Sequence, residues 1–187
     1  MTSERSRARG YTMIEVMMAL AVLAIGASGV MAMQRVTLIA NSNARNVSMA
    51  NQIASTWAER LRADAVQWNN PTTGPDLADT RWLKEVTILP SQWFAPTGTA
   101  PNGTAWANIN GDDLYGVTRA AYCTHIRLTQ LYPTLIRAEI RVFWARNESA
   151  IDCSEANPSA VDSSYDKYGF VYVTTGILNN VIPDFTP

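Results

Sequence analysis

The chain has 187 residues, a formal net charge of −1, 47% hydrophobic residues and 17% charged residues. This length accommodates one domain and a long helix. Because the charge is mildly acidic and no basic run is interleaved with aromatic residues, nucleic acid is not expected as a partner.

An apolar segment near the N-terminus is long enough to cross a membrane. Between Tyr11 and Met33 the only charged residue is Glu15, and about 20 mostly apolar residues suffice for a spanning helix. Basic flanks stay in the cytoplasm, so the preceding arginines predict that the N-terminus is inside and that everything after Arg35 is outside. The segment is too long for the core of a secretory signal, and no cleavage site of that type follows it. We therefore expect it to remain in the product.

Glu15 is unusual because it lies inside this apolar segment. A carboxylate at the centre of a membrane helix costs about 2.5–3.5 kcal/mol, and such residues are commonly functional. The alternative is an acid tolerated at the cytoplasmic membrane interface, since Glu15 lies near that end.

The stretch Arg-Gly-Tyr-Thr-Met-Ile-Glu-Val, residues 9–16, resembles the class III leader and N-terminal helix of type IV pilins and pseudopilins. The resemblance implies that prepilin peptidase cleaves between Gly10 and Tyr11 and removes Met1 to Gly10. It also implies N-methylation of Tyr11, which replaces the usual phenylalanine of the motif. The processed chain would have 12 basic and 15 acidic residues, a net charge of −3.

The resemblance also assigns a role to Glu15. Cleavage creates a positive amine on Tyr11, and the Glu15 carboxylate of one subunit would pair with that amine of its neighbour in a bundle of helices. A buried unpaired charge is much less favourable than a paired one. Glu15 is therefore expected to act in assembly, by setting the register in which subunits dock.

The apolar spacing predicts that the helix continues to about Trp68. Apolar or small residues recur with helical spacing at Val36, Ala40, Val47, Ala50, Ala54, Trp57 and Leu61. We assign residues 1–10 to the leader, 11–34 to a transmembrane or filament-core helix, 35–70 to its periplasmic continuation and 71–187 to a globular head. Two helices with a kink near Gly26 and Gly29 are the alternative. Major pilins have a proline near position 32; here the residue is Ala32, which argues against a bulk filament subunit.

The segment after the helix begins with a linker, Pro71 to Pro75. We expect Asp76 or Asp79 to cap a short helix that reaches about Leu89. Residues 90–113 form a loop-rich tract that Trp93, Phe94 and Trp106 are expected to anchor to the head. An exposed binding loop is the alternative.

Three segments have the composition of β-strands, and the first two of them alternate between apolar and polar residues. Residues 122–129 and 136–144 predict two half-buried strands, joined at Tyr132-Pro133 in an antiparallel hairpin. Residues 168–175 predict a third strand. The expected fold class is α+β and type IV pilin-like: a long N-terminal helix, transmembrane in its first half, packed on a small antiparallel β-sheet head.

Two further stretches resemble PilV-type minor pilins, known as type IV pilus modification proteins. These are Leu135 to Trp144 and Ala24 to Gln34. This second resemblance covers only parts of the chain. It implies a minor pilin that primes or modifies filament assembly at or near the tip.

The two cysteines, Cys123 and Cys153, have no metal-binding spacing. In an exported domain a disulfide is the expected state, and it would stabilise the head by roughly 3–4 kcal/mol. A reactive thiol is the alternative.

Nothing in the sequence indicates an enzyme. His125 is the only histidine, and we expect it to be an exposed strand residue. Asp112-Asp113 after Gly111 fits an ordinary turn better than half of a calcium site. No phosphate loop, nucleophile elbow or zinc constellation is present, so no catalytic residue, metal site or cofactor is predicted.

Two classes of function remain. One is an assembly protein whose partners are major and other minor pilins, prepilin peptidase, the inner-membrane assembly platform, membrane lipid and a tip adhesin; a type II secretion pseudopilin is its variant. The other is a pilin-like adhesin or DNA-uptake subunit. Either implies insertion in the bacterial inner membrane with a periplasmic head, followed by entry into the filament.

Overall fold

The computed structural model describes residues 11–69, 76–98, 103–117, 119–147, 149–151, 153, 161 and 166–179. The leader and Gly10 therefore lie outside the described residues. The chain divides into two compact units, with the boundary between Ala44 and Arg45.

The helix α1 spans Met13–Trp68 and has 56 residues. The carbonyl of Thr12 accepts hydrogen bonds from the backbone N–H groups of Glu15 (3.1 Å) and Val16 (3.3 Å), which places the start of the helix. Gly26 and Gly29 both lie inside this one α-helix. The expectation of a helix from about Tyr11 to about Trp68 is confirmed, and the alternative of two separate helices is wrong.

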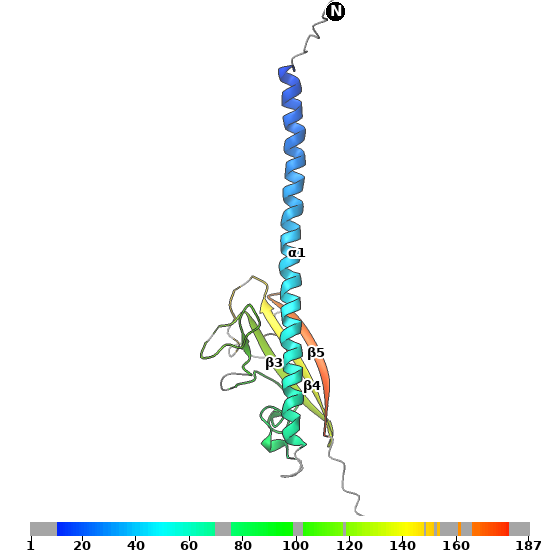
Figure 1. The fold of residues 1–187 in the computed structure, drawn as a ribbon, viewed down its shortest axis with the longest axis vertical. Coiled ribbons are helices and arrows are strands. Elements are labelled where there is room, and N and C mark those ends of the chain that lie inside the picture. Colours follow the sequence, from blue (N-terminus) through cyan, green and yellow to red (C-terminus); the bar gives the residue numbers. More distant parts are fainter. Residues whose placement is uncertain are drawn as a thin grey trace, which may run out of the picture. The chain divides into compact units, whose positions relative to one another are not determined.

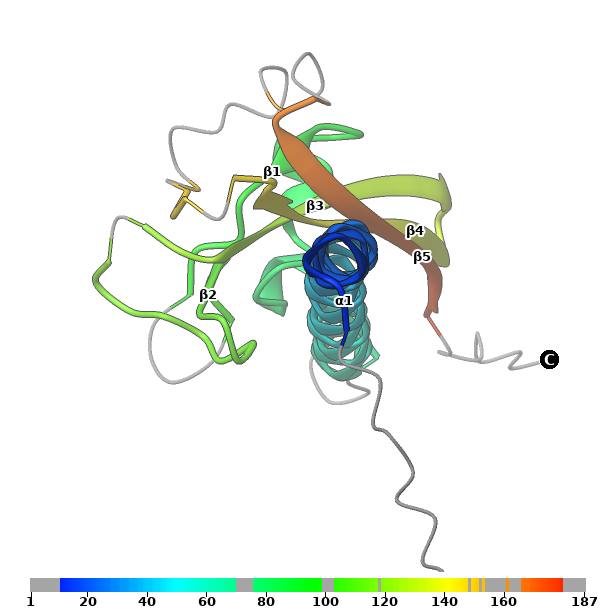
Figure 2. The same ribbon diagram turned by 90° about the horizontal axis from the view of Figure 1, so that it is seen from above.

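The head, from Arg45 onward, contains an antiparallel sheet packed on the C-terminal half of α1 (Figure 1). Its strands are β1 (Trp93–Phe94), β2 (Trp106–Ala107), β3 (Tyr122–Tyr132), β4 (Leu135–Ala145) and β5 (Tyr168–Leu178). The strand order is β1-β3-β4-β5, and β2 also pairs with β3. Figure 2 shows β1 and β2 on one side of the sheet and β5 on the other. The predicted α+β, pilin-like architecture and the hairpin are confirmed; β1 and β2, inside the tract expected to be loops, were not predicted.

The main core lies between α1 and the inner face of the sheet. The helix contributes side chains with helical spacing, including Ala50, Ala54, Trp57 and Leu61, as the sequence predicts. Trp57 is 1% exposed and packs edge-to-face against Trp82, with 5.4 Å between ring centroids. Aromatic pairs in this arrangement add stability beyond their buried area.

A second, smaller core covers part of the outer face of the sheet. Cys123 and Phe143 on that face pack with residues from the connecting segments, among them Ala105, Ala120 and Ile151. The first half of β3 and the second half of β4 are therefore buried on both faces. The expectation of half-buried strands is wrong there, because alternation along a strand does not show what the connecting segments cover.

Cys123 and Cys153 form a disulfide with a Cα–Cα distance of 5.5 Å. Both residues lie in the second core. The bond ties the beginning of β3 to the segment that follows β4, as the sequence predicts.

The segment 76–89 is not one helix. Asp76 caps a short 3-10 helix, η1 (Leu77–Asp79), by accepting a hydrogen bond from the N–H of Ala78. The separate helix α2 covers only Glu85–Ile88. Between them the backbone turns toward Asp64, whose carboxylate accepts hydrogen bonds from three consecutive N–H groups, those of residues 81–83. This contact with α1 replaces the helical hydrogen bonds that a continuous helix would need.

Candidate functional site

The first part of α1 presents apolar side chains to the outside all around the helix. From Tyr11 to Ile39 its large hydrophobic residues are exposed, with Met13 at 82% and Ile25 at 73%. The apolar stretch of α1 is not buried within the described head, and by its length and composition the helix could cross a membrane. An apolar surface of this size is unfavourable in water, and contact with lipid or with other apolar helices would remove it from water.

Glu15 lies in the first turn of α1. A negative side chain is favoured there because the helix dipole and the unpaired N–H groups make the N-terminus partly positive. Tyr11 and Glu15 line one side of the helix together with Ala19 and Leu23. The carboxylate forms no salt bridge with the residues that the structure describes.

This face can therefore supply an exposed carboxylate within a continuous apolar surface. Tyr11, whose amine cleavage would liberate, is 81% exposed at the same end. One chain therefore carries both the Glu15 carboxylate and, at Tyr11, the residue whose amine cleavage would liberate. A second chain can bring an amine to the carboxylate as the two apolar surfaces are buried.

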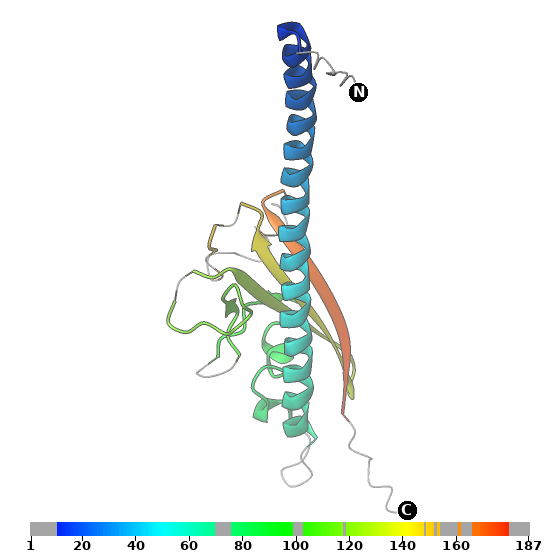
Figure 3. The ribbon, with the colours of Figure 1, turned by 45° about the horizontal axis from the view of Figure 1, so that its top comes forward.

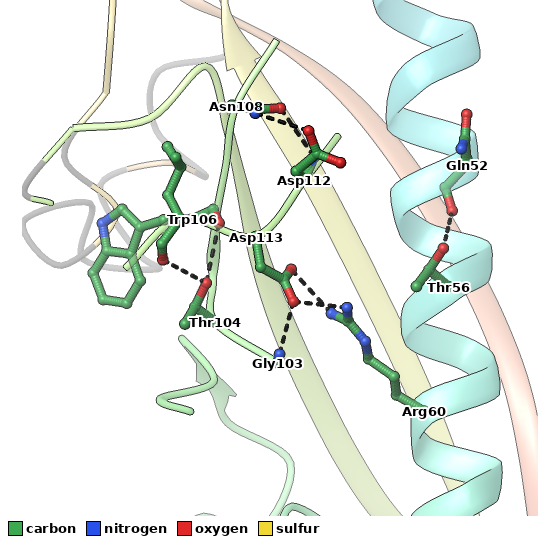
Figure 4. A network of polar contacts seen from close by, with 10 residues as sticks. Gln52, Thr56, Arg60, Gly103, Thr104, Trp106, Asn108, Asp112 and Asp113 are labelled. Carbon is green, nitrogen blue, oxygen red and sulfur yellow. Dashed lines mark hydrogen bonds and ion pairs between the residues drawn. The ribbon is translucent and has the colours of Figure 1, made fainter. Parts of the chain in front are cut away.

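In the head, a bidentate ion pair joins α1 to the loop before β3 (Figure 4). Arg60 donates to both carboxylate oxygens of Asp113, at 3.1 and 2.7 Å. The N–H of Gly103 donates to the same carboxylate at 2.8 Å, and the guanidinium also lies over the Trp57 ring, 5.0 Å from its centroid.

The carboxylates of Asp112 and Asp113 both have partners within the head. Asp113 is occupied by Arg60, while Asp112 accepts a hydrogen bond from the side chain of Asn108 at 3.0 Å and closes a turn. No group of three His, Cys, Asp or Glu that could hold a metal occurs among the described residues. The turn is confirmed, and the calcium-site alternative finds no support in this geometry.

The aromatic anchors of the tract 90–113 pack as predicted. Trp93 and Phe94 form β1, Trp106 begins β2, and both strands pair with β3. Gly111 has a positive φ of 84°, and a Cβ atom there would lie 2.8 Å from the Sδ atom of Met49. The tract is thus fixed against the sheet and α1, which favours packing over an exposed binding loop.

His125 is buried at 1% exposure, so the prediction of an exposed histidine is wrong. Its Nδ1 atom lies 2.9 Å from Nη2 of Arg141. Because a guanidinium only donates hydrogen bonds, Nδ1 must accept, and the neutral ring carries its proton on Nε2. Burial, and then the positive charge of Arg141, lower the pKa of His125 to about 4.

Arg141 is the other member of this buried cluster, with 0% exposure. Its guanidinium lies over the ring of Trp93, 4.5 Å from the centroid, and Arg127 lies over the same ring at 4.7 Å. Arg127 is also paired with Glu139 through two hydrogen bonds of 2.8 and 2.9 Å. The cluster holds β1 onto the sheet and is a structural feature of the head.

The predicted site residues thus fall into separate places. Tyr11 and Glu15 share the exposed end of α1, Cys123 and Cys153 are joined in the head, and Gly10 lies outside the described residues. The structural roles of the buried Asp64 and Arg141 and of the half-buried Arg60 were not predicted from the sequence. The sequence did contain one indication: Asp64 is a charged residue at a position where the helical spacing of α1 predicts an apolar one.

The family comparison agrees with the N-terminal motif. Residues 5–31 match the model of the prokaryotic N-terminal methylation motif. This match, together with the long helix and the antiparallel head, indicates a type IV pilin-like or pseudopilin protein. No curated protein and no solved structure matched the chain in the comparisons.

Proposed function

We propose that the chain is a minor pilin of a type IV pilus, which primes or modifies filament assembly at or near the tip. The observation that carries the proposal is the N-terminal methylation motif at residues 5–31, followed by an apolar helical surface with Glu15 in its first turn. A membrane-anchored subunit that later joins a helical bundle needs such a surface in both environments.

The processing step is cleavage of the peptide bond between Gly10 and Tyr11 by prepilin peptidase. Methylation of the new Tyr11 amine follows. The amine lacks a helical hydrogen-bond acceptor, and a positive group at the N-terminus of a helix is unfavourable. A carboxylate from a neighbouring chain would offset that cost.

In the docking step, Glu15 pairs with the processed Tyr11 amine of an adjacent subunit. The pair forms within the low-dielectric interior of the bundle, where an isolated charge costs several kcal/mol. Only a register that brings the two charges together is favourable, so the pair positions each subunit along the filament axis. The apolar surface supplies the area buried in that step.

The proposed location is the bacterial inner membrane, with the head in the periplasm, and then the pilus. The proposed partners are major and other minor pilins, prepilin peptidase and the assembly platform. Ala32, at the position where major pilins have proline, supports a minor rather than a bulk subunit. The neighbouring genes separate this proposal from a type II secretion pseudopilin, since a pilus role predicts other minor pilins and a large tip adhesin.

The processing step is tested by mass spectrometry of the chain extracted from membranes. The expected product begins at Tyr11 and carries one N-terminal methyl group. Substitution Gly10→Leu should block cleavage, because access to the scissile bond requires a small residue. Retention of residues 1–10 in cells with active peptidase would contradict the proposal.

A further inference from the structure

The outer edge of β5 is unprotected in the described part of the head. β5 pairs with β4 in unbroken register from Tyr168 to Leu178 and is the last strand of the sheet. Figure 3 shows it along the margin of the head, with no described strand beyond it. Edge strands usually carry lysines, prolines or bulges that prevent further pairing. β5 has no proline, no charged residue and no bulge.

The hydrogen bonds at both ends of the β4–β5 ladder show which backbone groups point outward. The N–H of Asn179 donates to Thr134 at 2.8 Å, and that of Arg146 donates to Lys167 at 2.9 Å. Hydrogen-bonded and non-hydrogen-bonded pairs alternate in an antiparallel ladder. The odd-numbered residues of β5 therefore direct their backbone groups to β4, and the even-numbered residues direct theirs away from the sheet.

Among the residues that the structure describes, hydrogen bonds cap the two ends of this edge and leave its middle uncapped. The side-chain amide of Asn69 donates to the carbonyl of Leu178 at 3.4 Å, and Nε of Arg146 donates to the carbonyl of Tyr168 at 2.9 Å. Between these capped ends lie Tyr172, which is 52% exposed, and the exposed residues 174 and 176. Each can exchange two hydrogen bonds with an added antiparallel strand.

A cation lies one strand inward from this open edge. Arg137 on β4 is directly opposite Gly176 on β5, which contributes no side chain of its own; the Leu135 side chain lies beside it, with Cδ1 3.6 Å from where a Cβ of Gly176 would be. Its side chain is 44% exposed, and its contact with Glu139 is long, at 3.7 Å. Glu139 is already engaged by Arg127 in two short hydrogen bonds.

We propose that the edge of β5 from Tyr172 to Gly176 binds an extended acidic segment of a partner protein. The segment adds as an antiparallel strand, and an Asp or Glu side chain opposite Gly176 pairs with Arg137. Main-chain hydrogen bonds supply affinity in this mode of recognition, and alternate side chains supply specificity. A second copy of this chain fits less well, because β5 contains no carboxylate to offer Arg137.

The test measures binding of fluorescent nine-residue peptides to the full chain in detergent micelles. The peptides alternate threonine and valine around one central Glu, with a Glu→Gln peptide as the control. Substitution Thr174→Pro removes one outward N–H without touching the ladder to β4, and Thr174→Val is its matched control. Peptides methylated on the backbone nitrogens of one edge cannot donate hydrogen bonds from that edge. They test the same pairing with the unaltered chain.

We expect Thr174→Pro to weaken binding about tenfold and Thr174→Val to leave it within about twofold, given the usual worth of backbone hydrogen bonds. The Glu→Gln change should weaken binding about fivefold for the unaltered chain, and not for the Arg137→Gln variant. Equal binding of N-methylated and unmodified peptides, or of the Glu and Gln peptides, would overturn the proposal. Self-association that Thr174→Pro abolishes would assign the edge to a second copy instead, and so would also overturn it.

Discussion

Asp64 of α1 and Trp82 of the segment before α2 are joined by a hydrogen bond of 2.8 Å, from the backbone N–H to the carboxylate. The same carboxylate receives the N–H groups of Arg81 at 2.7 Å and Leu83 at 3.0 Å. Asp64 is only 7% exposed, so a single side chain satisfies three donors, two of which, the N–H groups of Trp82 and Leu83, would otherwise be buried without partners.

Asp64→Ala should destabilise the head by about 2–4 kcal/mol, because unsatisfied buried donors each cost about 1–3 kcal/mol. The control is Asp79→Ala, which removes an exposed carboxylate at the end of η1 and should change stability by less than about 0.5 kcal/mol. Denaturant unfolding of a soluble fragment from Arg35 onward measures both. Equal losses for the two variants would contradict the assigned role of Asp64.

Arg60 and Asp113 should be coupled in stability. Asp113→Ala leaves Arg60 and the N–H of Gly103 without their acceptor, and we expect a loss of about 1–3 kcal/mol. In the double variant Arg60→Ala/Asp113→Ala the loss should be smaller than the sum of the single losses, because the pair is removed together. Asp112→Ala, in the exposed turn with Asn108, is the control and should cost less than about 1 kcal/mol. Strict additivity would show that the ion pair adds nothing.

The stability of the head should fall as the pH is lowered from about 6.5 toward 4. The folded state holds the pKa of His125 at about 4, against 6.5 for the ordinary side chain. The unfolded chain therefore binds a proton more readily, and the folded state loses about 3 kcal/mol over this range. Substitution His125→Gln should flatten the profile there, as followed by unfolding at a series of pH values.

A second loss of stability is expected at lower pH, from Glu139. Because it occurs in a different pH range, it can be distinguished from the loss caused by His125. The hydrogen bonds from Arg127 lower the pKa of Glu139 below its usual 4.5, so its contribution is present above that value and disappears as the pH falls further. Glu139→Gln should alter only the acidic end of the profile. A His125→Gln variant with an unchanged slope between pH 6.5 and 4 would contradict the account of the buried cluster.

The disulfide should form in the exported head and stabilise it. We expect Cys153→Ser to lower the free energy of unfolding by about 2–4 kcal/mol and to make Cys123 reactive only after unfolding, because both residues are buried. Thiol labelling and mass measurement of the unaltered exported head should detect no free cysteine. Labelling of both cysteines in folded, exported protein would refute the bond.

Local patterns in the sequence predicted the long elements, and tertiary contacts decided the rest. The apolar spacing from Ala50 to Leu61 placed one face of α1 in the core, and period-two alternation located β3 and β4. The two-residue strands β1 and β2 have no periodicity of their own and exist only through pairing with β3.

The errors have the same physical origin. His125 alternates with core residues along β3, so it was placed on an exposed face, but the second core and Arg141 cover that face. The helix expected over 76–89 was interrupted because Asp64, distant in sequence, binds its backbone. The N-terminal motif, in contrast, was readable because its chemistry depends on neighbouring residues at fixed spacing.

In the proposed docking step, Glu15 pairs with the processed amine of a neighbouring subunit. Glu15→Ala should leave membrane insertion intact, since it removes a charge from an apolar helix, and cleavage after Gly10 should continue. Burying the neighbour's amine without a partner would cost several kcal/mol, enough to exclude the subunit from the filament.

The measurement is the ratio of the chain in sheared pili to the chain in membranes, for wild type and Glu15→Ala co-expressed with the pilus system. An exposed-residue substitution on α1, Asn51→Ala, serves as the matched control and should retain the wild-type ratio. We expect normal, cleaved Glu15→Ala protein in membranes and its loss from the pili. Recovery of Glu15→Ala in pili at the wild-type ratio would show that Glu15 is only a tolerated interfacial acid and would contradict the docking mechanism.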